Sequence, residues 1–69
     1  MQLSSRNQLK ATVIDVKLGG IMAEVRMRLQ GGEELVAAIT RSSAERLGLQ
    51  PGAEVTALIK ATEVMVATE

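Results

Sequence analysis

The pattern of apolar and polar residues along the chain predicts a small protein built mainly from β-strands. In residues 2–18 the apolar side chains occupy odd positions up to Val13 and even positions from Ile14 to Leu18. Such a change of phase inside one strand is typical of a β-bulge, where one extra residue turns the following side chains to the opposite face. We therefore expect one long, bent strand, followed by a hairpin turn at Gly19-Gly20.

The second predicted strand, residues 21–29, has the most regular alternation in the chain. One phase is entirely apolar, and the other is mostly charged, which is the pattern of a strand with one buried and one solvated face. A second turn is predicted at residues 30–32. The apolar phase consists of Ile21, Ala23, Val25, Met27 and Leu29, and the charged residues are Glu24, Arg26 and Arg28.

Three further segments, residues 33–40, 55–59 and 64–67, predict a third, fourth and fifth strand that are largely apolar on both faces. A strand of this kind needs cover on both faces. One short helix cannot provide it, so the pattern indicates that other subunits contribute the cover.

A single-turn helix is predicted between the third and fourth strands. Ser42 as N-cap and Glu45 three residues later match a capping box, and Gly48 is a suitable C′ residue. Pro51-Gly52 fits the centre of a type II turn. Five strands with a helix between the third and fourth match an all-β, OB-like barrel, a small and partly open architecture. We expect residues 1–69 to form one such domain.

Composition supports an oligomer and narrows the function. Hydrophobic residues make up 46% of 69 residues, yet the chain contains no Phe, Trp, Tyr, Cys or His. A chain this short buries little apolar surface alone and has no disulfide to compensate. Eight basic residues balance eight acidic ones. Nucleic-acid binding, which is common for OB-folds, is disfavoured because stacking aromatics and a basic groove are missing. An enzyme is not expected either, since no nucleophile–base pair is apparent.

The chain has no apolar run long enough to span a membrane and no recognisable signal peptide. A cytoplasmic protein without membrane or nucleic-acid partners is therefore the expectation.

Two polar segments, residues 4–8 and 60–64, adjoin predicted strands at opposite ends of the chain. They carry hydroxyls, an amide, a guanidinium in Arg6 and an ammonium in Lys60. These groups donate hydrogen bonds to an anion, and the two cations add charge. A small oxyanion site is one interpretation. The other is a solvated strand edge with an exposed lysine.

A second candidate lies at the predicted helix start, where Thr40, Ser42 and Ser43 combine hydroxyls with free backbone N–H groups. The alternative is that Ser42 serves only as a helix cap.

Three segments, residues 4–9, 39–43 and 55–64, resemble the molybdate-binding Mop domain family, also called molbindins. The resemblance covers essentially the whole chain. It implies an OB-like subunit, a hexamer built as a trimer of dimers, and molybdate or tungstate bound between subunits without direct protein–metal ligands. The oxyanion-binding residues that it implies are Ser4, Ser5, Arg6, Asn7, Lys60 and Ala61.

Two positions depart from the family pattern. Ser5 stands where the family often has Ala, and Ala61 stands where related domains often have Ser, so any contact from Ala61 must come from its backbone N–H. The leading hypothesis is molybdate binding for intracellular molybdenum storage and homeostasis. The alternative is a regulatory or structural oligomerisation module without a storage role.

Overall fold

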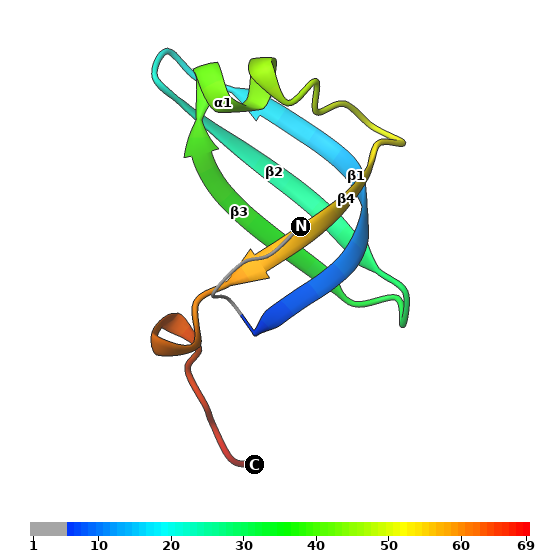
Figure 1. The fold of residues 1–69 in the computed structure, drawn as a ribbon, viewed down its shortest axis with the longest axis vertical. Coiled ribbons are helices and arrows are strands. Elements are labelled where there is room, and N and C mark those ends of the chain that lie inside the picture. The colour runs from blue at the N-terminus through cyan, green and yellow to red at the C-terminus, as the bar shows by residue number, and fades with distance from the viewer. Residues whose placement is uncertain (1–5) are drawn as a thin grey trace.

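A curled, four-stranded antiparallel sheet forms the body of the protein (Figure 1). The computed structural model describes residues 6–69. The sheet has the order β3-β2-β1-β4, and the helix α1 follows β3 directly. The elements are β1 (Asn7–Leu18), β2 (Met22–Leu29), β3 (Glu34–Thr40), α1 (Arg41–Arg46), β4 (Glu54–Ile59) and the 3₁₀-helix η1 (Ala61–Glu63).

The long strand β1 joins the two halves of the sheet and bends between them. Its first half pairs with β4, from Asn7 opposite Ile59 to Thr12 opposite Glu54, and its second half pairs with β2. The register with β2 shifts between Val13 and Asp15, which leaves Ile14 as the extra residue. The predicted bulge is therefore confirmed, and it lets one strand serve both sides of the curl.

The core lies inside the curl. Val13 and Val25 are its most completely enclosed side chains, and Ala11, Met27 and Ala57 surround them. The predicted alternation of β2 is confirmed, because Ala23, Val25 and Met27 are buried while the charged residues between them are exposed. Ile21 does not continue this stripe: it precedes the first residue of β2 and is 80% exposed.

The predicted turns are also confirmed. Gly19 N–H donates to the Met22 carbonyl oxygen at 2.7 Å in the first hairpin, and Gly32 takes a φ of 98° in the second. Gly52 has a φ of 94°, and Ala53 N–H donates to the Gln50 carbonyl oxygen at 3.0 Å, as a type II turn requires.

The start of α1 differs from the capping box that the sequence predicts. The N-cap is Thr40 instead of Ser42, and its hydroxyl accepts a hydrogen bond from Ser43 N–H at 3.1 Å. The helix begins two residues earlier because β3 runs into it without a linker, and Thr40 at the junction keeps the extended backbone that an N-cap needs. Glu45 instead forms an ion pair with Arg41 at 3.6 Å.

The end of α1 is as predicted. Gly48 adopts a φ of 66°, its N–H donates to the Glu45 carbonyl oxygen, and Leu49 N–H donates to the Ala44 carbonyl oxygen. These two bonds form a Schellman motif with Gly48 at C′. Within residues 6–69, no helix has the length and apolarity needed to cross a lipid bilayer.

The prediction of a fifth strand at residues 64–67 is wrong for the chain by itself. After β4 ends at Ile59, η1 redirects the chain, and residues 64–69 leave the body without regular structure (Figure 1). An apolar strand pattern indicates a tendency to pair, but pairing needs a neighbouring strand, and no strand within residues 6–69 pairs with the tail. The architecture remains all-β and OB-like, with four strands in place of five.

Candidate oxyanion-binding site

The pairing of β1 with β4 brings Arg6 and Lys60 to the same end of the sheet. Asn7 lies opposite Ile59 in this antiparallel pair. Because the two strands run in opposite directions, the residue before Asn7 and the residue after Ile59 both continue past that end. Arg6 and Lys60 therefore both lie just beyond this final pair, one on each strand's side of the ladder. The sequence left open whether these segments meet within one chain, and the fold brings them together.

Asn7 has a structural role that the sequence did not indicate. Its side-chain Nδ2 donates a hydrogen bond to the Ile59 carbonyl oxygen at 3.1 Å, and the side chain is partly buried. This bond fixes the end of β4 against the start of β1. Asn7 thus holds the frame from which Arg6 and Lys60 extend.

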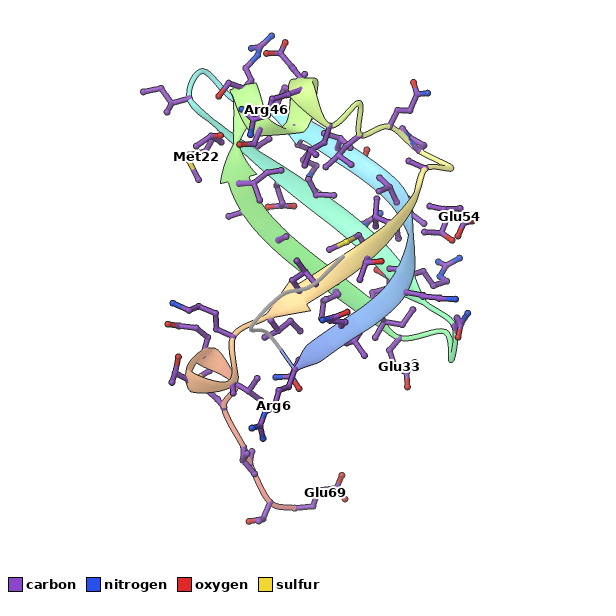
Figure 2. The ribbon with its side chains drawn as sticks, in the orientation of Figure 1. Arg6, Met22, Glu33, Arg46, Glu54 and Glu69 are labelled. Carbon is purple, nitrogen blue, oxygen red and sulfur yellow. The ribbon has the colours of Figure 1, made fainter. Side chains whose placement is uncertain are left out.

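Both cations of this site are exposed, and no ion pair found within residues 6–69 uses either of them. The ion pairs in that range join Arg26 and Arg28 to Glu34, and Arg41 to Glu45. Figure 2 shows Arg6 extending from the start of β1 away from the sheet. The two positive charges can therefore face a solvent anion without first breaking a salt bridge.

The turn after β4 positions Lys60 and Ala61. Lys60 is the N-cap of η1 with an extended backbone, and its side chain makes no capping bond. The turn is closed by Glu63 N–H, which donates to the Lys60 carbonyl oxygen at 2.9 Å. Ala61 is the first residue of η1. Because a methyl side chain has no hydrogen-bond donor, Ala61 can contact an anion only through its backbone N–H. Ser4 and Ser5 lie outside the residues that the structure describes.

The second candidate set is also brought together. Thr40 Oγ1 donates to Ser43 Oγ at 2.7 Å and lies 3.4 Å from Ser42 Oγ. The three hydroxyls form one exposed group at the start of α1. These hydroxyls already form hydrogen bonds with one another. An anion at this position would have to replace one of these bonds or accept from a hydroxyl hydrogen that is not used in them.

Arg46 belongs to this second group, although the sequence analysis did not single it out. Its Nη2 donates to Ser43 Oγ at 3.5 Å. The spacing in the sequence could have indicated this contact, because Ser43 and Arg46 are three positions apart and such residues share one face of a helix. The nearby Arg41 is engaged elsewhere: its Nη1 donates to the Gly19 carbonyl oxygen at 3.1 Å.

The two groups lie at opposite ends of the sheet. Figure 2 shows Arg6 near the end where η1 begins and Arg46 at the end occupied by α1. Pairing agrees with this, because Thr40 lies opposite Met22 next to the first hairpin, whereas Asn7 lies at the far end of β1. Within one chain they cannot hold the same anion, so they constitute two separate candidates.

Comparison with known proteins identifies the family. The model of the TOBE domain matches residues 3–66. "Molybdenum-pterin-binding protein 1" of Clostridium pasteurianum is 47% identical over 66 residues, which cover 96% of this chain and 97% of that protein. The solved structure of a molybdate-binding protein from Sporomusa ovata is 50% identical, with a TM-score of 0.93 over 99% of this chain and 100% of that one.

A third similar structure is that of the cytoplasmic molybdate-binding protein ModG with molybdate bound. It is 44% identical with a TM-score of 0.85, and the match covers 88% of this chain and 43% of that chain. Together, the matched domain, the near full-length relatives and the shared curled sheet show that the chain belongs to the TOBE domain family and, within it, to the molbindins (Mop).

Proposed function

We propose that this protein binds molybdate, and tungstate in the same way, at the end of the sheet that carries Arg6 and Lys60. The observation that carries the proposal is that these two exposed cations both lie just beyond the Asn7–Ile59 pair, at the same end of the sheet, with no acidic partner within residues 6–69. A dianion with four acceptor oxygens suits two cationic donors that lie at the same end of the sheet. The molybdate-binding proteins to which the chain is similar support the same ligand.

The proposed ligand set is Ser4, Ser5, Arg6, Asn7, Lys60 and Ala61. In this set Arg6 and Lys60 supply charge, the serines supply hydroxyls and Ala61 supplies its backbone N–H. All of them contact oxygens of the anion, and none bonds to the metal. Cationic, hydroxyl and amide groups are suitable for binding the oxygens of the anion, because they donate hydrogen bonds. A carboxylate in their place would repel the anion.

We place this site between subunits of a homo-oligomer, a hexamer arranged as a trimer of dimers. Because Arg6 and Lys60 are exposed, an anion bound to them within one chain would remain in contact with solvent on one side. Residues of a second subunit can cover that side. Large apolar side chains on the surface support assembly: Val36 is 59% exposed and Leu58 is 47% exposed. A binding protein of this kind stores molybdenum without transforming it, and the cytoplasmic setting of ModG is the setting that we propose here.

The hydroxyl group of Thr40, Ser42 and Ser43, together with Arg46, is proposed as a second oxyanion site. In an assembly with threefold symmetry, copies of this group can converge on the axis. One dianion would then be shared among three chains, each contributing hydroxyls and one guanidinium.

The alternative is an oligomerisation module without a storage role. Molybdenum analysis of the purified oligomer after equilibrium dialysis against molybdate separates the two functions. Storage predicts saturable uptake with a fixed number of anions per chain and displacement by tungstate. An intact oligomer that takes up no molybdate would favour the structural role.

A further inference from the structure

Arg41 joins the first hairpin loop, residues 19–21, to the start of α1 (Figure 1). Its backbone N–H donates a hydrogen bond to the Ile21 carbonyl oxygen at 2.7 Å, and its side-chain Nη1 donates to the Gly19 carbonyl oxygen at 3.1 Å. Arg41 is the first residue of α1, whereas both acceptors lie between β1 and β2. A single residue therefore holds the loop with its backbone and its side chain.

The loop depends on this support because its own residues restrict it little. Gly19 and Gly20 lose more backbone freedom on ordering than any other residue type, which makes an ordered glycine loop costly in entropy. Ile21 is 80% exposed, so its side chain does not anchor the loop. Gly19 is nevertheless needed, since a Cβ at this position would lie 2.9 Å from the Met22 carbonyl oxygen. The loop is thus fixed by a contact from outside it.

Glu45 orients the side chain of Arg41. Its Oε2 lies 3.6 Å from Arg41 Nε, one helical turn away. The guanidinium is a rigid plane with several donors, so Nε can face Glu45 while Nη1 donates to Gly19. Both contacts are made to groups of the protein. Arg46 has a different position, because its Nη2 lies 3.5 Å from Ser43 Oγ, within the second candidate site.

The loop adjoins the strand end that carries the hydroxyl cluster of Thr40, Ser42 and Ser43. Thr40 pairs with Met22 in the last step of the β2–β3 ladder, and the backbone bond of Arg41 to the loop extends that ladder by one residue. Thr40 is also the N-cap that accepts from Ser43 N–H at 3.1 Å. A shift of the loop would therefore displace the end of β3 and the hydroxyls that depend on it.

We propose that Arg41 is a positioning residue for this hydroxyl cluster. It holds the loop against α1 and thereby fixes the hydroxyls, without contacting the anion itself. The inference rests on the proposed second oxyanion site. It assigns different roles to two neighbouring arginines, since Arg46 supplies the guanidinium that faces the anion and Arg41 uses its own to contact Gly19 and Glu45.

Two substitutions break the contact from opposite sides. Arg41→Met removes the guanidinium and keeps a side chain of similar length. Gly19→Ala leaves the charge of Arg41 in place but forces the loop to move, because the added Cβ would lie 2.9 Å from the Met22 carbonyl oxygen. Gly20→Ala is the matched control, since a Cβ at Gly20 would meet no atom within 4 Å.

Molybdate titration of each assembled variant by calorimetry gives the affinities of the two classes of site. The second class is defined as the one that Ser42→Ala with Ser43→Ala removes. Arg41→Met and Gly19→Ala should each weaken it roughly tenfold, as expected for the loss of one hydrogen bond from a charged group, and leave the first class unchanged. The double variant should bind no more weakly than the single ones, because both remove the same contact. Gly20→Ala should bind like the unchanged protein.

Other results would contradict the positioning role. A weakened Arg41→Met beside an unaffected Gly19→Ala would show that the charge of Arg41 acts on the anion directly. Unchanged affinities in both variants would show that the loop does not influence the hydroxyl cluster. An unmodified protein with a single class of site would overturn the proposed second site, and the role of Arg41 with it.

Hydrogen exchange tests the contact without any anion and covers the case in which Gly19→Ala does not fold. Gly19 N–H donates to the Met22 carbonyl oxygen at 2.7 Å and closes the loop. In Arg41→Met this N–H should exchange faster, whereas amides in the middle of β2 should keep their rates. Unchanged protection of Gly19 N–H would overturn the role of Arg41 and leave the proposed anion sites untouched.

Discussion

Asn7 Nδ2 donates a hydrogen bond to the Ile59 carbonyl oxygen at 3.1 Å, and this contact ties the start of the first strand to the end of the last one. Loss of this bond should loosen the frame of the anion site. Asn7→Ala is expected to lower the free energy of unfolding by about 1 kcal/mol, a typical value for one hydrogen bond, and to weaken molybdate binding. Asn7→Asp should weaken binding more, because its carboxylate repels both the Ile59 carbonyl and the anion.

Thermal unfolding and titration calorimetry measure these two effects. Gln30→Ala, a neutral and exposed change at a turn, is the matched control and should alter neither. Asn7→Ala with unchanged stability and unchanged affinity would show that this hydrogen bond has no part in the site.

Removing either cation of the candidate site should weaken anion binding without unfolding the protein. Arg6 and Lys60 are exposed and take part in no ion pair within residues 6–69, so neither substitution breaks a structural contact of that kind. A charge-assisted hydrogen bond contributes about 1.5–3 kcal/mol, which corresponds to roughly a 10- to 150-fold loss of affinity for Arg6→Ala. Lys60→Ala should cost less, because an ammonium is a less directional donor than a guanidinium.

The control for charge is Lys17→Ala, which removes one exposed cation near the other end of β1. Its molybdate affinity by calorimetry should match that of the unchanged protein. Equal affinities for all four proteins would place the anion somewhere other than this end of the sheet.

The capping residue of α1 can be verified by comparing two single substitutions. Thr40→Ala removes the hydroxyl that accepts from Ser43 N–H and should destabilise the protein by about 1 kcal/mol. Ser42→Ala removes only a 3.4 Å contact between hydroxyls on the surface and should cost much less. Denaturant unfolding of both variants gives the order, and a larger loss for Ser42→Ala would restore it as the cap.

The second anion site predicts a change of stoichiometry. The double change Ser42→Ala with Ser43→Ala leaves the capping hydroxyl of Thr40 in place and removes two of the three clustered hydroxyls. We expect fewer molybdates per hexamer in molybdenum analysis, with the Arg6 and Lys60 sites still filled. Arg46→Ala should act in the same direction, because its guanidinium contacts Ser43 at 3.5 Å. An unchanged number of anions in both variants would eliminate this second site.

The features that depend on neighbours along the chain could be predicted from the order of residues alone. The alternation in β2 identified Ala23, Val25 and Met27 as buried, and the change of phase in β1 located the bulge at Ile14. Gly48 and Gly52 marked a helix end and a turn, since both need the positive φ that glycine adopts readily. Side-chain period and backbone conformation are local properties, so a pattern of residues can specify them.

The features that depend on contacts between distant segments became visible only in the folded chain. Only the pairing of β1 with β4 brings Arg6 and Lys60 to the same end of the sheet and provides Asn7 with its hydrogen-bond partner. Thr40 is the N-cap of α1 because β3 ends at Thr40 and the helix begins at the next residue. The sequence spacing is equally compatible with Ser42 as the N-cap. The tail from Val64 has the pattern of a strand, but no strand within residues 6–69 pairs with it. A strand forms only through hydrogen bonds to a neighbouring strand, and the residues of the tail do not specify which neighbour lies within reach.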